Sequence, residues 1–158
     1  MEHIDVDDID TFPHPMGSTS GGQALSDELG ATNVALNRYT LEPGEGSSGG
    51  LHTHLDQEEV FYVLSGTVTF QTAEGSVEVS EDEAVRFAPG DYHHGTNQSD
   101  DPATVLAIGA PGPQHDWEQI RVPMPCPDCE DVDALGIRFT DDGETALSCP
   151  ECGRDVEI

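Results

Sequence analysis

The chain has 158 residues, of which 32 are Asp or Glu and only 5 are Lys or Arg, so its formal net charge is −27. This length allows one ordinary domain with a small appendage. Such a charge repels phosphate backbones and anionic lipids, so we expect neither nucleic acid nor membranes as partners.

The acidic excess is interpreted as adaptation to a salt-rich cytoplasm, as in extreme halophiles, because concentrated salt screens the self-repulsion of the surface. No apolar run is long enough to span a bilayer, and the N-terminus does not have the pattern of a signal peptide. The four cysteines have metal-binding spacing, which requires reduced thiols. The expected location is therefore cytoplasmic.

Residues 1–29 begin with many acids and end in a Gly/Ser-rich stretch. Their composition predicts a flexible tail, or alternatively an arm in which Phe12 and Met16 pack on a barrel or on a sister subunit. Residues 26–29, which end at Gly30, are expected to form a single turn. His3 and His14 have no companion at ligand spacing, so they receive no ligand role.

Residues 30–118 consist of short apolar segments that Gly/Pro-rich turns separate. This pattern favours an all-β domain, an antiparallel sandwich or barrel. Trp117 is expected to pack over one end of it. The predicted strands are 34–41, 47–54, 59–65, 67–71, 76–79, 84–87 and 103–110. The aromatic candidates for lining a pocket are Tyr39, Phe61, Tyr62, Phe70, Phe87 and Tyr92.

Histidines and acids recur within these segments. His52 and His54 are two residues apart, so on a strand both side chains project from the same face. Imidazole and carboxylate together suit a divalent metal such as Mn, Fe, Ni, Cu or Zn. Alternation along the strand does not decide between Glu58 and Glu59 as the acid, because either register buries apolar side chains.

The spacing Gly46-x5-His52-x-His54-x4-Glu59-x6-Gly66, followed by His93-x3-Asn97, resembles the two motifs of the cupins. The resemblance extends over about residues 30–115 and implies a jelly-roll barrel of β-strands. It implies that His52, His54, Glu59 and His93 ligate the metal. By the motif spacings it selects Glu59 over Glu58 and His93 over His94, and it gives Asn97 a part in holding the second motif in shape.

The second motif departs from the family pattern in two places. Asp82 stands where the family has its leading glycine, and Ala88 stands where it has proline, with Pro89 displaced by one residue. Neither departure removes a ligand, but both affect the expected turns.

The C-terminal residues contain two C-x2-C pairs, Cys126 with Cys129 and Cys149 with Cys152, which 19 residues separate. Four thiolates can surround one tetrahedral ion. Residues 136–140 and 144–148 around Asp141-Asp142-Gly143 predict a hairpin. The arrangement resembles a zinc ribbon. Two disulfides, or an iron site of the rubredoxin kind, are the alternatives.

We therefore expect a tail or arm in residues 1–29, a cupin barrel in 30–118, a stiff linker in 119–125 and a zinc ribbon in 126–158. So small a module would depend on its metal for most of its folding energy. Because it contains only Arg138 and Arg154 as bases, a structural or protein-contact role is favoured over nucleic-acid binding.

The resemblance implies a metal-dependent cupin acting on a small molecule, an oxidoreductase of the dioxygenase type or another metal-assisted enzyme such as an isomerase, decarboxylase or lyase. No catalytic residue beyond the ligands can be named. The alternative is a non-catalytic, metal-dependent small-molecule sensor or binding module with the ribbon as its protein contact. A barrel whose metal only stabilises it is the third hypothesis. Exposed sheet edges would be hidden in a homodimer, which we expect.

Overall fold

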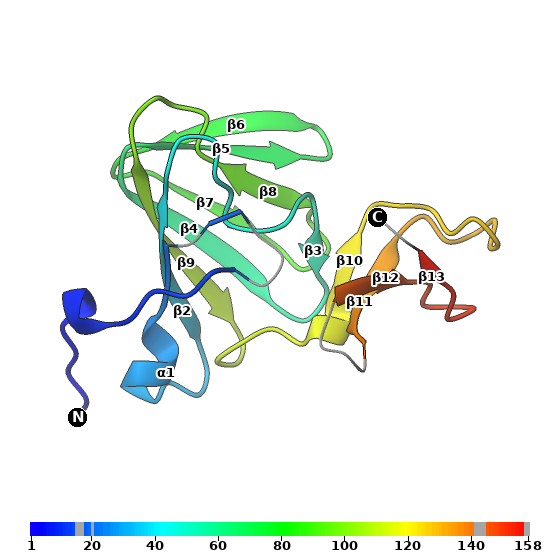
Figure 1. Ribbon diagram of the computed structural model, residues 1–158, viewed down its shortest axis with the longest axis horizontal. Coiled ribbons are helices and arrows are strands. Elements are labelled where there is room, and N and C mark those ends of the chain that lie inside the picture. Colours follow the sequence, from blue (N-terminus) through cyan, green and yellow to red (C-terminus); the bar gives the residue numbers. More distant parts are fainter. Residues whose placement is uncertain (15–17, 20, 141–144, 157–158) are drawn as a thin grey trace.

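The computed structural model describes residues 1–14, 18–19, 21–140 and 145–156. Strands dominate it, as predicted, and Figure 1 shows a barrel with a smaller group of strands beside it. The helical elements are η1 (Val6–Asp8), α1 (Leu25–Leu29) and η2 (Trp117–Gln119). The strands of the barrel are β1 (Gly21–Ala24), β2 (Ala35–Leu41), β3 (Thr53–His54), β4 (Glu58–Ser65), β5 (Thr67–Thr72), β6 (Gly75–Ser80), β7 (Ala84–Phe87), β8 (His93–Thr96) and β9 (Ala103–Ala110). Those that follow are β10 (Ile120–Val122), β11 (Leu135–Phe139), β12 (Thr145–Ser148) and β13 (Asp155–Val156).

Two antiparallel sheets make up most of the barrel, in the orders β1-β2-β9-β4-β7 and β6-β5-β8. In β9 every second residue is buried, so Ala103, Val105 and Ala107 face inward, as a strand with one buried face requires. The core draws side chains from both sheets. It consists of Tyr39, Leu41, Phe61, Val63, Val68, Phe70, Val79, Phe87, Ala103, Val105 and Ala107.

The third sheet joins the barrel to the cysteine-bearing residues. Its order is β13-β12-β11-β10-β3, so the short β3 of the barrel is its edge strand. In Figure 1 the yellow-to-red strands lie beside β3. Their side chains form a second apolar cluster, which includes Leu135, Ile137 and Leu147. We call residues 120–156 the C-terminal module, with 141–144 outside the described residues.

Two sequence predictions about this region need correction. The strand expected over 47–54 is reduced to Thr53–His54, with isolated bridges at Gly46 and His52, because Gly49 and Gly50 offer no side chain to pack on a sheet. Residues 119–125 were expected to be a linker, but they contain β10, which is hydrogen-bonded to β3 on one side and to β11 on the other.

The N-terminal residues contact the barrel. Phe12 bridges to Gly22 and packs against the core, which is the arm alternative for this residue, whereas Met16 lies outside the described residues. The turn expected at 26–29 is α1, which ends at Gly30 with a left-handed φ of 61°. The hairpin expected around Asp141–Gly143 also lies outside the described residues. Within the described ranges, no helix is long and apolar enough to cross a membrane.

Candidate metal centres

Side chains from three strands and one bridge converge inside the barrel. Glu59 lies on β4, His54 on β3 and His93 on β8, while His52 precedes β3 and pairs with His93. One donor atom from each of the four lies within 4.8 Å of the others. The structure therefore brings together the residues that the sequence singled out.

Backbone carbonyls fix how two of these imidazoles are oriented. His52 Nδ1 lies 2.9 Å from the Gly50 carbonyl oxygen, and His93 Nδ1 lies 3.2 Å from that of Asp91. A carbonyl can only accept, so in the neutral rings Nδ1 carries the proton. Both Nε2 atoms then present a lone pair to the centre of the cluster, which is the usual second-shell arrangement around a metal-ligating histidine.

The donor atoms are spaced as cis ligands of one ion would be. His52 Nε2 lies 3.2 Å from His54 Nε2, and Glu59 Oε2 lies 2.9 Å from His93 Nε2 and 3.4 Å from His54 Nε2. Bonds of about 2.1 Å at right angles would put neighbouring donors about 3.0 Å apart. Lone pairs and a carboxylate repel at such distances unless a cation lies between them, so the residues fit a divalent metal.

The protonation states agree with this. Burial, reinforced by His93 and His54, lowers the pKa of His52 to about 3, so its ring is neutral near pH 7. Burial alone would raise the pKa of Glu59. In the metal-free cluster the contacts with the His54 and His93 rings outweigh this effect and hold the pKa of Glu59 well below its usual value. The cluster thus offers a neutral imidazole and a carboxylate, both ligand forms.

The two rival ligands lie elsewhere. Glu58 pairs with Arg86 on the exposed face of β4. His94 Nδ1 lies 2.9 Å from Ser48 Oγ, and its ring is not part of the cluster. Alternation along β4 and β8 accounts for both outcomes, since adjacent residues project to opposite faces.

Both departures from the second motif have a structural counterpart. Asp82 adopts a left-handed φ of 65°, a conformation that glycine takes most readily and Asp tolerates. The N–H of Ala88 donates to Asp91 Oδ2 at 2.8 Å, which a proline could not do. Asn97 is fully buried, and its amide donates to the carbonyls of Leu41 and Asp101, so it ties the end of β8 to two neighbouring segments.

A cavity of about 200 Å³ opens beside the metal cluster, and three of the four ligands, His52, His54 and Glu59, line it. Of the six aromatic candidates, Tyr39 and Phe61 line it. Phe70 and Phe87 belong to the core instead, and the Phe87 ring stacks on His93 with a centroid distance of 4.4 Å. Tyr62 faces outward, where its hydroxyl donates to Asp82 at 2.7 Å, and Tyr92 does not contact the cavity among the described residues.

The aromatic rings that line the cavity include those of His14, His115 and Trp117, to which the sequence assigned no role in binding. The His115 ring lies 4.7 Å from the His54 ring and 4.7 Å from that of Trp117, centroid to centroid. Its Nε2 is buried and has no hydrogen-bond partner among the described residues. Burial is the main cause that lowers the pKa of His115 to about 4, and the neighbouring His54 ring adds to it.

His115 could not have been found from spacing, because tertiary contacts place it. The Gln57 amide donates to the carbonyls of Pro111 and Gln114, and Asp56 accepts from the N–H of Asp116 at 2.7 Å. These contacts hold the segment after β9 against the segment before β4.

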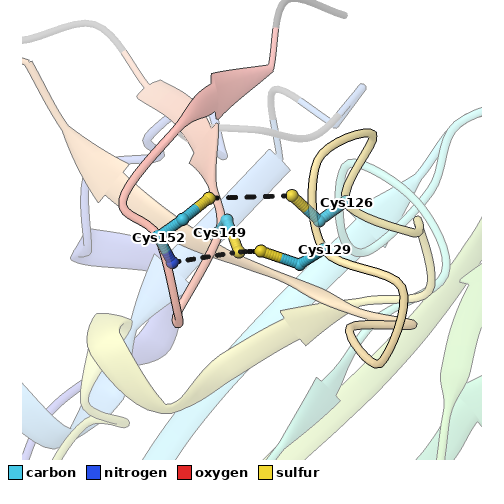
Figure 2. A group of neighbouring side chains, drawn as sticks. All are labelled: Cys126, Cys129, Cys149 and Cys152. Atoms are coloured by element: carbon cyan, nitrogen blue, oxygen red, sulfur yellow. Dashed lines mark hydrogen bonds between the residues drawn. The ribbon is translucent and has the colours of Figure 1, made fainter.

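The four cysteines form the second cluster, and none of them is in a disulfide. Figure 2 shows the pair from 126–129 facing the pair from 149–152. Cys126 Sγ lies 3.8 Å from Cys152 Sγ, and Cys149 Sγ lies 3.9 Å from Cys129 Sγ. A tetrahedral ion with Zn–S bonds of about 2.3 Å has sulfurs about 3.8 Å apart, so the site fits such an ion. The Cys152 N–H, 3.5 Å from Cys149 Sγ, lowers the pKa of that thiol to about 7, whereas the hydrogen bond with the Cys152 side chain raises the pKa of Cys129 to about 12. The site's fit to an ion therefore rests on the spacing of the sulfurs.

Comparison with protein families gives a match of residues 37–109 to the model of a cupin domain. The match contains all four residues of the barrel cluster. No curated protein matches the sequence of the chain at a significant level.

Solved structures with a similar fold cover most of the chain. A sugar phosphate isomerase of a cupin superfamily from Silicibacter pomeroyi has a TM-score of 0.66 and 22% identity, over 96% of this chain and 94% of that one. A polyketide cyclase from Streptomyces resistomycificus has a TM-score of 0.66 and 18% identity, over 81% and 89%. A protein described as a predicted oxalate decarboxylase, from Thermotoga maritima, has a TM-score of 0.59 and 20% identity, over 69% and 98%. At these identities the likeness establishes the fold alone.

Proposed function

We propose that this chain, whose barrel has the cupin jelly-roll fold and whose family match supports the cupin superfamily, is a metal-dependent enzyme acting on a small molecule. The observation that carries the proposal is the convergence of His52, His54, Glu59 and His93 at a cavity. A divalent transition ion held there would supply a Lewis acid or a redox centre to a molecule that binds through oxygen. Zinc is proposed for the cysteine cluster, on the spacing of its sulfurs.

The cavity has no lysine or arginine side chain among its described lining residues, which bears on the class of substrate. The chain has no lysine, and none of the described residues that line the cavity is an arginine. A phosphate group would therefore find no fixed cation there apart from the metal. This favours a substrate that has no anionic group apart from the atoms that bind the metal, and it argues against the isomerisation of a sugar phosphate.

A non-catalytic small-molecule sensor or binding module is the second candidate. The observation that favours it is that Ile120, Val122 and Met124 of the C-terminal module also line the cavity. A ligand bound there would contact the module, which could transmit occupancy to another protein. The two candidates share the metal cluster and differ only in turnover.

Two neighbouring acids provide the test. Metal-loaded protein is assayed for oxygen consumption and product formation with catechols, thiols and 1,3-diketones, beside Glu59→Gln and the matched control Glu58→Gln. We expect turnover and barrel metal to be lost in Glu59→Gln and kept in Glu58→Gln, because Glu58 lies at the exposed face with Arg86. Tight binding of a trial compound without turnover supports the sensor. Equal metal content in both variants contradicts both candidates.

A further inference from the structure

The metal cluster and the C-terminal module share a sheet. His54 pairs with Ile120, and Thr53 pairs with Arg121, so the strand that carries one of the four ligands is hydrogen-bonded to β10. β10 in turn pairs with β11 through Arg121↔Gly136 and Val122↔Leu135. The cysteine-bearing module is thus continuous with one wall of the metal site, and Figure 1 shows β3 and β10 side by side.

The cavity has chemically different walls. The barrel contributes three of the four ligands, His52, His54 and Glu59, and every polar group of the lining, together with a few apolar side chains such as Leu51 and Phe61. The module contributes only apolar side chains, which are Ile120, Val122, Met124, Ile137 and Leu147. A molecule that fills the cavity would therefore have one polar end and one apolar end.

The module's wall is supported by its cysteines. Ile120, Ile137 and Leu147 belong to the same buried cluster as Cys126 and Cys149. Those three side chains are almost fully buried, so they mainly support the residues that face the cavity. Val122 and Met124 are only half-buried and pack against the cluster, so they present apolar surface to the cavity.

His115 also lines the cavity, where its ring contacts the rings of His54 and Trp117. Its buried Nε2 has no partner among the described residues, and an unpaired buried polar atom is unfavourable. A polar group of a bound molecule could pair with it. Trp117 lies against the His115 ring on one side and, at 5.1 Å between ring centroids, against Phe139 of the module on the other.

We propose that the four-cysteine module is the substrate-selecting wall of the cavity. It selects a small amphipathic molecule, with an oxygen-donor head directed at the four ligands and an aliphatic or aromatic body that packs against Val122 and Met124. At about 200 Å³ the cavity is smaller than the range of about 300–1,000 Å³ that is usual for drug-sized ligands, so the body is no larger than one ring or a short chain. This inference rests on the proposed function, because the head requires the barrel metal.

The test uses two probes with the same chelating head, acetohydroxamate and benzohydroxamate, on full-length protein loaded with metal. Binding is followed by the emission of Trp117, the only tryptophan, and by calorimetry. We expect benzohydroxamate to bind at least about tenfold more tightly than acetohydroxamate, because burial of its ring adds apolar contact.

Val122→Glu is expected to reduce this ratio to less than about threefold, with the affinity for acetohydroxamate and the metal content unchanged. The matched control is Val77→Glu, since Val77 on β6 is exposed and does not line the cavity. Because a charge in β10 could unfold the module, Met124→Gln provides a second variant outside the strands, with the same expected direction.

Several results would overturn the inference. They are equal affinities of the two probes for the unmodified protein, a ratio unchanged in Val122→Glu and Met124→Gln, and failure of both probes to bind the metal-loaded chain. Absence of metal from the barrel is a different result, because it contradicts the proposed function itself. Metal analysis of each sample before titration separates the two.

Discussion

Position 82 shows how one residue departs from a motif without loss of the fold. Its φ of 65° lies in the left-handed region, and the Tyr62 hydroxyl donates to its carboxylate. Asp82→Val should lower the free energy of unfolding by about 1–2 kcal/mol, because a β-branched side chain is strained there. Asp82→Gly is the matched control. It should lower the free energy of unfolding only by the small amount that one exposed hydrogen bond contributes. Urea unfolding measures both, and equal stability of the valine and glycine variants would contradict the conformational argument.

The buried ligand His52 gives metal-free protein a defined pH dependence. Its folded pKa, lowered to about 3 by burial, is below the value of 6.5 for the unfolded chain. Between these values the unfolded state binds the proton and the folded state does not, so stability falls as pH is lowered from about 7 toward 3. The slope from one such group is at most about 1.4 kcal/mol per pH unit.

Urea unfolding of chelator-treated protein at pH 7.5 and pH 5 measures this slope. His52→Gln should have a shallower slope than the unmodified chain, whereas His3→Gln, which changes an exposed residue, should keep it. A slope that is identical in His52→Gln would show that other groups cause the acid sensitivity.

Among the elements, β3 is the one whose stability depends most on a neighbour. It has two residues, and its strand partner is β10 of the C-terminal module. Cys149→Ser removes a buried ligand of the cysteine cluster and should loosen β10. We expect the affinity for the barrel metal to fall about threefold to tenfold, since His54 is then less well held. Metal titration of the variant tests this coupling, which an unchanged barrel affinity would contradict.

The sequence predicts the elements whose signals are local. Strands such as β9, which has the predicted bounds of 103–110, follow from alternation and turn residues. It does not predict β10, because Ile120–Val122 becomes a strand only through pairing with distant β3 and β11. The ligands follow from motif spacing, whereas His115 and Trp117 reach the cavity through contacts of Gln57 and Asp56 that no spacing encodes. The apolar wall of the cavity has the same non-local origin.

For the whole molecule, the net charge of −27 predicts that stability depends on salt. Within the described residues, four of the arginines pair with acids, so most carboxylates have no cationic partner. Salt at molar concentration screens their mutual repulsion. Between 0.1 and 2 M KCl the free energy of unfolding should increase by about 1 kcal/mol or more. The thermal midpoint should accordingly rise by several degrees. A midpoint that stays constant or falls would argue against the halophilic interpretation of the composition.

The homodimer expected from exposed sheet edges stays a prediction. Such edges offer unpaired backbone groups that a second copy can cover. Light scattering in molar salt should give a mass of two chains, and a mass of one chain at working concentration contradicts it.

We infer that three imidazoles and one carboxylate hold one ion in the barrel, at a site distinct from that of the four cysteines. Elemental analysis of protein purified at high salt without a histidine tag tests it most directly, with His93→Ala beside the matched control His94→Ala. We expect two metal ions per chain in the unmodified protein and in His94→Ala, and one in His93→Ala. Two ions in His93→Ala, or the same loss in both variants, would contradict it.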